Sequence, residues 1–282
     1  MSILHTAAID LQPADLTCVN SLIRLIRAST LKHNFREQSH SSRTLIAVSR
    51  IHRILLEGIP YHITQRGNGR QRVFFEDRDY TLYLDLLRNN CTEQRLSIWG
   101  YCLMPNHIHL ITMPERAAAM AQAMGRTNAD FARYYNMRKR SCGHVWQARY
   151  HSTPLDAPHH WRAMAYVERN PVRAHPAACA EDYEWSSARP RLEGRGDMLH
   201  LTPWQAKYDG PRWQEALRSS IDEEAFGQRL REASRRGRPL GDEEFEENLE
   251  KRCGRRLRAR PVGRPKKISK EEGGQLSFGY GV

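Results

Sequence analysis

The sequence lacks the marks of a secreted or membrane protein. Its six cysteines are scattered along the chain, with no CxxC pair and no regular spacing. This is the pattern of reduced thiols rather than of a disulfide scaffold. No apolar run reaches the roughly 18 residues that a membrane-spanning helix requires, and no basic region followed by an apolar one stands at the amino terminus. We therefore expect a cytoplasmic protein with no membrane partner.

Acidic residues are also few in relation to basic ones. The chain has 44 Lys and Arg against 32 Asp and Glu, which gives a formal charge of +12. This excess favours a polyanionic partner, with nucleic acid the leading candidate, although a generically basic soluble protein would have the same composition. Residues 251–267 contain nine Lys or Arg and no acid, so this stretch should be solvated or bound to something anionic.

Changes in composition divide the 282 residues into four parts. Residues 1–45 mix polar and isolated apolar residues, and we predict a weakly ordered extension there. Residues 46–191 carry regular patterns and should form the main domain. Residues 192–250 are predicted to form an accessory helical segment, and residues 251–282 a basic, flexible tail that binds nucleic acid. The helical patches of the accessory segment are Trp213–Leu217, Ala225–Ala233 and Glu243–Leu249.

The main domain opens with a strand-like segment, Tyr61–Thr64, which stops at the turn signal Arg66–Gly69. Apolar residues then recur at three-to-four spacing from Asp77 to Gln94 and predict a helix. Two strands follow, Leu96–Leu103 and His107–Met113. The proline-containing turn between them suits an antiparallel hairpin at the centre of a sheet.

The second half of the domain continues this alternation. Ala117–Arg140 is rich in helix formers, and Trp146–Leu155 is predicted to be extended. Asp156 is a good N-cap for a further helix that runs to about Arg169, and Pro171 ends this helix because proline cannot donate the next backbone hydrogen bond. Helices that alternate with strands around a central hairpin predict an α+β sandwich of ferredoxin-like type with an antiparallel sheet.

His107 and His109 stand two apart in a predicted strand, so both side chains project from the same face. Two adjacent imidazoles make half of a metal site. The same HxH pattern also occurs as plain polar surface. A metal site therefore needs at least one further ligand from elsewhere in the chain.

Tyr166 and Asn170 stand four apart on the helix predicted after Asp156, which places both side chains on one face at adjacent turns. One element thus offers a nucleophilic phenol and an oxygen ligand. A tyrosine of an amphipathic helix is often a core residue, however, and an asparagine before proline is often only a helix terminator. The spacing alone leaves both interpretations open.

Several motifs occur together in the order and spacing of one known family. They are Tyr61–Gly67, Tyr101–Leu110, Phe131–Arg138, Gly143–Tyr150, Tyr166–Ala174 and Trp185–Ala188. Together they cover roughly residues 51–190, and this part of the chain resembles the REP-associated tyrosine transposases, which are relatives of the single-tyrosine HUH transposases. The conjunction of motifs is specific, although no single motif is.

The resemblance implies a set of site residues and a mechanism. His107 and His109 would be the HUH pair that binds one divalent ion, Mg²⁺ or Mn²⁺, with Asn170 as the third protein ligand, a position where some relatives have glutamine. Tyr166 would attack a phosphodiester and form a 5′-phosphotyrosine, helped by the charge of the ion. The base that assists Tyr166 cannot be named from the sequence.

The resemblance also implies a partner and a location. The partner would be a single-stranded DNA hairpin of the repetitive extragenic palindrome (REP) type, and the protein would be cytoplasmic and associated with a bacterial nucleoid. The sequence leaves open whether the protein is a monomer or a homodimer.

Basic and aromatic side chains of the domain are candidates for contacts with phosphates and unpaired bases. They are Arg66, Arg70, Arg126, Arg133, Arg138, Lys139, Arg140, Arg149, Trp146 and Tyr150. In the tail, Arg260, Arg264, Lys266 and Lys267 resemble an arm that lies in the minor groove of AT-rich DNA. An electrostatic tether without specificity is the favoured role of this arm, and each domain residue is equally consistent with a solvated charge or a packed ring.

Three functions fit these motifs. The first is a DNA transposase-like transesterase that nicks and joins single strands. The second is a non-catalytic protein that binds DNA hairpins and has a vestigial site, and the third is a metal-dependent nuclease that uses water instead of tyrosine. The complete set of His107, His109, Tyr166 and Asn170 favours the first.

Overall fold

The computed structural model describes residues 53–174, 176–194, 210–218 and 223–258. These contain a four-stranded antiparallel sheet with the strand order β2-β3-β1-β4. The strands are β1 (Tyr61–Arg66), β2 (Leu96–Met104), β3 (His107–Pro114) and β4 (His151–Pro154). With one helix after β1 and another after β3, this is the order of a ferredoxin-like sandwich, so the predicted fold class is confirmed.

The predicted helices lie close to their expected positions, and the structure adds short helical segments that were not predicted. In the first half of the chain they are η1 (Asn68–Arg70), α2 (Asp77–Gln94) and α3 (Ala119–Lys139). In the second half they are α4 (Ala157–Glu168), α5 (Asn170–Arg173), η2 (Ala180–Asp182), α6 (Ala188–Leu192), α7 (Gly210–Arg218), α8 (Glu223–Arg236) and α9 (Glu243–Cys253). The bounds of α2 agree with the prediction, and those of α3 and α4 differ from it by no more than two residues.

The strand predicted over residues 146–155 is shorter than expected. Only β4 pairs with β1, because bends interrupt the chain at residues 147–149. Trp146 makes a single bridge to Gly67 and its ring turns into the core, with 9% of the residue exposed.

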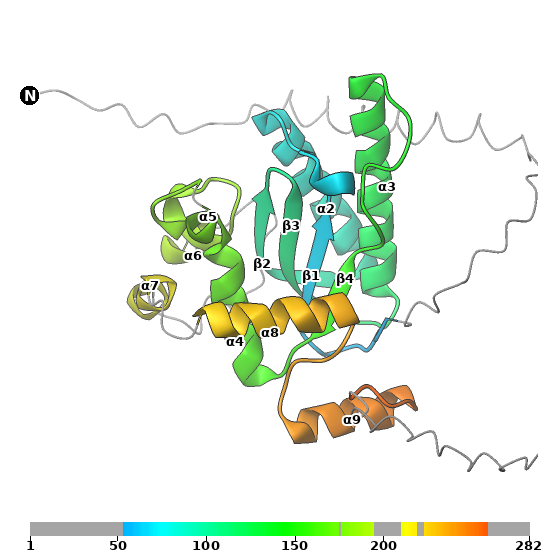
Figure 1. Ribbon diagram of the computed structural model, residues 1–282, viewed down its shortest axis with the longest axis vertical. Coiled ribbons are helices and arrows are strands. Elements are labelled where there is room, and N and C mark those ends of the chain that lie inside the picture. The colour runs from blue at the N-terminus through cyan, green and yellow to red at the C-terminus, as the bar shows by residue number, and fades with distance from the viewer. Residues whose placement is uncertain (1–52, 175, 195–209, 219–222, 259–282) are drawn as a thin grey trace, which may run out of the picture.

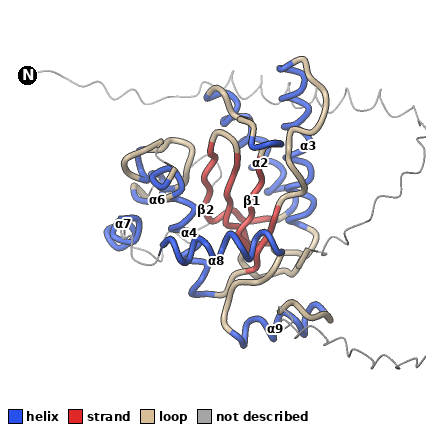
Figure 2. Tube along the Cα trace, viewed as in Figure 1, coloured by secondary structure: helices blue, strands red, loops and turns tan. Residues whose placement is uncertain are grey.

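Helices cover both faces of the sheet. α2 and α3 pack against each other on one face, whereas α4 contacts β2 and β3, and α8 contacts β4 and β1, on the other (Figures 1 and 2). The alternation of β3 follows these layers: Ile108 and Leu110 belong to the cluster under α2 and α3, and Ile111 belongs to the cluster under α4 and α8. The odd-numbered residues of β3, His107 and His109 among them, therefore face the second layer.

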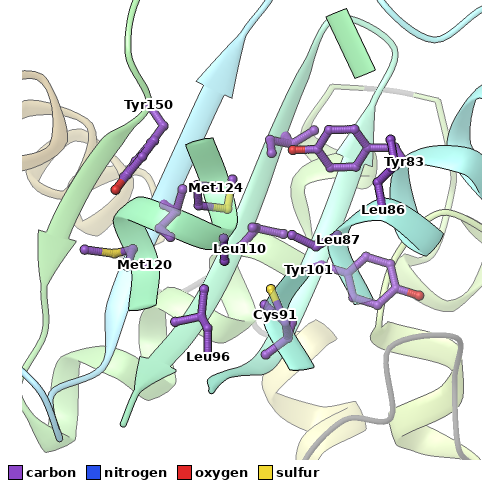
Figure 3. Packing of buried hydrophobic residues seen from close by; sticks show 14 of the residues in the cluster. Tyr83, Leu86, Leu87, Cys91, Leu96, Tyr101, Leu110, Met120, Met124 and Tyr150 are labelled. Carbon is purple, nitrogen blue, oxygen red and sulfur yellow. The ribbon is translucent and has the colours of Figure 1, made fainter. Parts of the chain in front are cut away.

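The core on the α2 and α3 side is large and rich in aromatic rings. Leu87 and Leu110 lie close together in Figure 3, and Tyr83 belongs to the same cluster. The ring of Tyr83 stands edge-on to that of Phe131, with centroids 5.2 Å apart, an arrangement that favours the aromatic quadrupoles. This core holds the sheet rigid beneath the opposite face, where the paired histidines lie.

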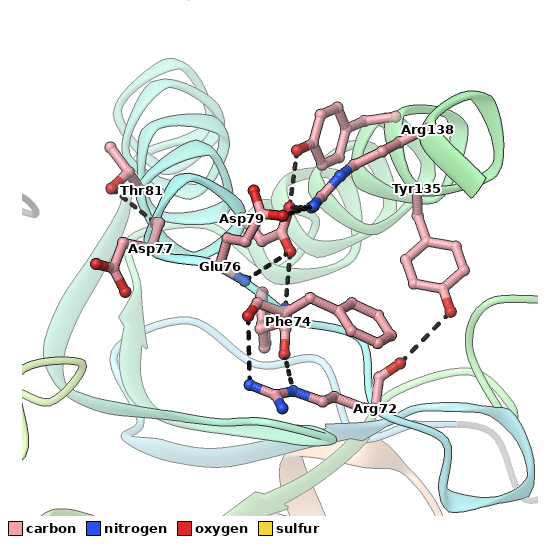
Figure 4. A network of polar contacts seen from close by, with 10 residues as sticks. Arg72, Phe74, Glu76, Asp77, Asp79, Thr81, Tyr135 and Arg138 are labelled. Atoms are coloured by element: carbon pink, nitrogen blue, oxygen red, sulfur yellow. Dashed lines mark hydrogen bonds and ion pairs between the residues drawn. The ribbon is translucent and has the colours of Figure 1, made fainter.

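A network of polar contacts ties the beginning of α2 to the end of α3 (Figure 4). The carboxylate of Asp79 accepts hydrogen bonds from the backbone N–H of Phe75 at 2.7 Å and of Glu76 at 3.2 Å. The Tyr134 hydroxyl donates to the same carboxylate at 2.7 Å, and Arg138 forms an ion pair with it. Asp79 and Glu76 complete a capping box, which satisfies backbone donors that a helix start leaves open.

On the other face, a buried carboxylate anchors α4. Glu168 is fully buried, and one of its oxygens accepts from the Ser187 hydroxyl at 2.6 Å and from Arg191 Nε at 2.8 Å. Its second oxygen accepts from Trp213 Nε1 of α7 at 2.8 Å. Because both carboxylate oxygens of Glu168 have hydrogen-bond donors, these bonds fix the end of α4 to α6 and α7.

Helices α7, α8 and α9 lie beyond the main domain that the sequence defined. Trp213, Phe226 and Leu230 of α7 and α8 are buried against α4, and Leu249 of α9 is buried with the other core. In the described part of the chain, no helix is long and apolar enough to span a bilayer. The predicted N-terminal extension, and Arg260, Arg264, Lys266 and Lys267 of the tail, lie outside the described residues.

Candidate active site

His107 and His109 lie side by side on the face of the sheet that α4 and α8 cover. Their ring centroids are 5.0 Å apart. His109 is buried and His107 is half-buried. A 2.6 Å hydrogen bond joins His107 Nδ1 to Asn106 Oδ1, which fixes the orientation of the His107 ring. The shared face is the one that the two-residue spacing predicted.

A third imidazole, which the sequence analysis did not single out, completes this row. His62 of β1 is 2% exposed, and its Nε2 lies 2.8 Å from His109 Nδ1. Its Nδ1 lies 3.2 Å from the Ser234 hydroxyl of α8, which in turn is 2.9 Å from the Thr153 hydroxyl of β4. The signal for His62 is its place in β1, since the central pairing of β1 with β3 brings same-face residues of both strands together.

Tyr166 projects from α4 toward the imidazoles. Its ring centroid is 6.0 Å from that of His109 and 6.4 Å from that of His62. The residue is 2% exposed. Gly227 of α8 lies so close that a Cβ there would be 2.8 Å from Tyr166 Cε2. The phenol is therefore buried, and it is buried in the same pocket as the histidines.

Two arginines reach the phenol oxygen. Arg173 Nη1 of α5 donates to it at 2.6 Å, and Arg231 Nη1 of α8 donates at 3.4 Å. The Arg173 guanidinium also stands 4.3 Å from the centre of the Tyr166 ring, a cation–π contact. Neither arginine was predicted as a site residue, although Arg173 stands within the motif Tyr166–Ala174, because nothing in the chain spacing shows that α5 and α8 converge on one atom.

Asn170 is joined to this pocket through Arg173. It is 1% exposed, and its Oδ1 accepts a hydrogen bond from Arg173 Nη2 at 3.1 Å. The buried Nδ2 has no hydrogen-bond partner among the described residues. The predicted helix end is also observed here, because α4 stops at Glu168 and Pro171 stands in the first turn of the short helix α5.

Burial keeps the three imidazoles neutral. It lowers the pKa of His62 and that of His107 to about 3, with the positive charge of Arg173 acting in the same direction on both and that of Arg66 on His107. Burial also lowers the pKa of His109 well below its usual value, reinforced by His107 and His62. The rings therefore carry free lone pairs at neutral pH, as ligands of a metal ion must.

The residues of this pocket suit a divalent ion. Asn106 and His62 engage the Nδ1 atoms of His107 and His109, so each ring keeps its Nε2 for a metal, which is the usual outer-shell arrangement. Among the described residues, no group of three or more His, Cys, Asp or Glu side chains could hold a metal ion. A site here would combine two imidazoles with the amide oxygen of Asn170 and with water, a donor set acceptable to Mg²⁺ and more so to Mn²⁺.

The predicted DNA contacts fall into three groups. Arg66, Arg70, Arg140 and Arg149 are exposed cations, and Arg66 is paired in register with His107. Arg126, Arg133 and Arg138 form ion pairs with Glu93, with Asp130, and with Glu76 and Asp79 respectively. Lys139 stands 3.5 Å from the centre of the Phe75 ring.

The two predicted stacking residues are packed in the core. Trp146 Nε1 donates to the backbone oxygen of Asn128 at 2.9 Å. Tyr150 is 6% exposed, and the guanidinium of Arg53 covers one face of its ring at 3.8 Å. Neither ring offers a free face to an unpaired base in this structure.

Fold and site together define a class of protein, an α+β domain in which two strand imidazoles face a tyrosine carried by a helix. Residues 56–170 match the sequence model of the family described as "Transposase IS200 like". This match agrees with the resemblance of the motifs.

Two solved structures overlap the chain at low sequence identity. One, described as a REP-associated tyrosine transposase bound to a REP hairpin, is 15% identical over 54% of this chain and 90% of its own, with a TM-score of 0.43. The other, from Deinococcus radiodurans and assigned as a transposase, is 15% identical over 46% of this chain and 96% of its own, with a TM-score of 0.31. No curated protein matches the chain.

Proposed function

We propose that the chain is a metal-dependent transesterase that cuts and rejoins single-stranded DNA, with Tyr166 as its nucleophile. The observation that carries the proposal is the 6.0 Å separation of the Tyr166 and His109 rings in one pocket. At this spacing, the phenol oxygen and a metal ion held by the two imidazoles can reach the same phosphate. The proposed ligands of the ion are His107, His109 and Asn170.

The reaction is a balanced exchange of phosphoester bonds. The Tyr166 oxygen attacks phosphorus, a phosphorus–oxygen bond to tyrosine forms, and the bond from phosphorus to the 3′ oxygen of the leaving strand breaks. The phenol proton is lost, and the leaving strand gains a proton as its 3′ hydroxyl forms. A bound Mg²⁺ or Mn²⁺ would supply positive charge at the non-bridging oxygens.

The chain's own residues orient this reaction. Glu168 fixes the end of the helix that carries Tyr166, and the bonds to Asn106 and His62 hold the two imidazoles in place. Exposed Arg66, paired with His107, is proposed to contact a phosphate of the bound strand. The family motifs support a hairpin of the REP type as substrate, and the other exposed arginines are proposed to contact its phosphates.

The proposal is tested with a single-stranded hairpin oligonucleotide and the full-length protein in Mg²⁺ or Mn²⁺. Wild-type protein should cleave the strand and become covalently attached to it, whereas Tyr166→Phe should do neither. Cleavage that persists in Tyr166→Phe would select the hydrolytic nuclease instead. Hairpin binding without cleavage by wild type in either ion would select the non-catalytic binding protein.

A further inference from the structure

The pocket around the Tyr166 oxygen holds more hydrogen-bond donors than acceptors. Arg173 contributes two N–H groups and Arg231 a third, and they converge on the phenol oxygen and on Asn170 Oδ1. The buried Nδ2 of Asn170 is a further donor, and it has no partner in the part of the chain that the structure describes. A pocket with surplus donors and two guanidinium groups fits an oxyanion with several acceptor oxygens.

The charge of Arg173 is not compensated by its hydrogen-bond partners. Both groups to which it donates in the described part of the chain, the phenol of Tyr166 and the amide of Asn170, are neutral. Its charge reaches the imidazoles as well, since it helps lower the pKa of His62, His107 and His109. A guanidinium held half-buried among neutral groups would gain from an anion.

Arg231 comes from a part of the chain outside the matched family segment. It lies on α8, beyond residues 56–170, and Gly227 on the same helix allows the close approach to the Tyr166 ring. The other partner of Arg231 is Glu224 at 2.7 Å, and both side chains of this pair are well exposed. Because exposed ion pairs are weak, Arg231 can leave Glu224 at little cost.

We infer that Arg173 and Arg231 form a phosphate clamp, in which two guanidinium groups bind the non-bridging oxygens of the phosphate that becomes attached to Tyr166. This inference rests on the proposed function and deepens it. The clamp makes α8 part of the active site and makes Arg231 a catalytic residue supplied from outside the family segment.

The clamp acts on the atoms that gain negative charge during the exchange. As the Tyr166 oxygen bonds to phosphorus, the guanidinium groups that now donate to that oxygen are beside the new phosphodiester. Arg173 stays with the ring through its cation–π contact, so its position relative to the reacting oxygen is set before the strand arrives. Donors placed in advance stabilise a transition state without reorganisation.

Covalent capture under single-turnover conditions tests the clamp. Arg231→Ala and Arg173→Gln should each form the tyrosine–DNA adduct about 100-fold more slowly than wild type, the cost typical of one lost oxyanion donor. Arg229→Ala is the matched control, because it removes an exposed cation from the same helix. It should keep the wild-type rate. Wild-type adduct rates in both Arg231→Ala and Arg173→Gln would overturn the inference.

Lysine variants distinguish loss of the guanidinium group from loss of the fold. Arg231→Lys and Arg173→Lys keep the charge but lose the two-pronged geometry, so their adduct rates should lie between those of wild type and the truncated variants. Arg231→Ala should melt like wild type, which shows that the fold is kept. If Arg231→Lys then has the wild-type adduct rate, a positive charge alone suffices and a clamp that needs guanidinium geometry is refuted.

A separate measurement distinguishes failure of the clamp from failure of the proposed function. Inorganic phosphate should raise the melting temperature of wild type and of Tyr166→Phe, compared with chloride at equal ionic strength, because the clamp is intact in both. The double variant Arg173→Gln/Arg231→Ala should lose this shift. Equal shifts in all three proteins would refute the clamp, even if wild type forms the covalent adduct.

Discussion

A series of hydrogen-bonded side chains connects α8 to the proposed metal ligand His109. Thr153, Ser234 and His62 are joined in sequence by hydrogen bonds of 2.9 and 3.2 Å, and His62 meets His109 at 2.8 Å. An imidazole that binds a metal through Nε2 needs a partner at Nδ1 to fix its tautomer and orientation. His62 is therefore a positioning residue in this account.

Replacing His62 by alanine tests its role. His62→Ala should weaken Mn²⁺ binding by about tenfold to 100-fold, as the loss of an outer-shell partner commonly does. Isothermal titration of the DNA-free protein gives the dissociation constant. His144→Ala, which removes an exposed histidine after α3, should bind Mn²⁺ like wild type, and an unchanged constant in a folded His62→Ala protein would contradict the role.

Asp79 makes the stability of the fold depend on pH. Burial raises the pKa of its carboxyl, but hydrogen bonds from Phe75, Tyr134 and Arg138 outweigh burial and leave the pKa lowered. A lowered folded-state pKa means that the carboxylate stabilises the protein above the unfolded value of about 4, and that this contribution is lost as the pH falls through the lower folded value.

Asp79→Asn should accordingly be less stable than wild type at pH 7, by about 1–3 kcal/mol. The difference should shrink as the pH falls through the lowered pKa of the wild-type carboxyl, where that group becomes protonated as well. Urea unfolding across this pH range measures it. Asp77→Asn alters an exposed acid of the same first turn and should change little. A pH-independent gap between wild type and Asp79→Asn would show that the charge of Asp79 is not the cause.

Helix α8 packs directly against the candidate site. Its Gly227 leaves no room for a side chain, since an added Cβ would be 2.8 Å from the Tyr166 ring and 3.2 Å from Arg231 Nη1. Glycine lowers helix stability relative to alanine, so its presence here is explained by the close approach and not by the helix itself.

Two glycine-to-alanine substitutions separate these effects. Gly227→Ala should destabilise the protein by about 1–3 kcal/mol through overpacking and increase hydrogen exchange in α8. Gly125 lies in α3 with nothing near its Cβ position, so Gly125→Ala should stabilise by about 0.5–1 kcal/mol. If both variants gain stability in urea unfolding, α8 is not packed tightly on Tyr166.

The elements themselves were largely predictable from local patterns. The three-to-four spacing from Asp77 to Gln94 and the N-cap at Asp156 act within a few residues, and the structure has both helices where they were predicted. The strand predicted from Trp146 was too long because its aromatic rings belong to the core instead of to a strand face. Periodicity does not distinguish these two ways of burying a ring.

At the scale of the molecule, the two layers of helices have different uses. α2 and α3 close a large apolar core, while α4, α5 and α8 bring a phenol and two guanidinium groups over the imidazoles of the sheet. Spacing within one strand made His107 and His109 candidates, spacing within one helix made Tyr166 a candidate, and the resemblance of the motifs implied their roles. His62 and Arg231 were missed because their contacts join distant parts of the chain. Arg173 was missed because the chain passes from α4 to α5 between it and Tyr166.

The central claim is that Tyr166 becomes joined to the 5′ phosphate of the DNA fragment that lies 3′ of the cut. It is tested most directly by incubating the protein with a hairpin oligonucleotide labelled at either its 5′ or its 3′ end and separating the products by denaturing electrophoresis. The account predicts that the 3′ label stays attached to wild-type protein, the 5′ label is released on a shorter strand, and Tyr166→Phe yields neither product. Two free fragments with no label on the protein, or attachment that persists in Tyr166→Phe, would contradict it.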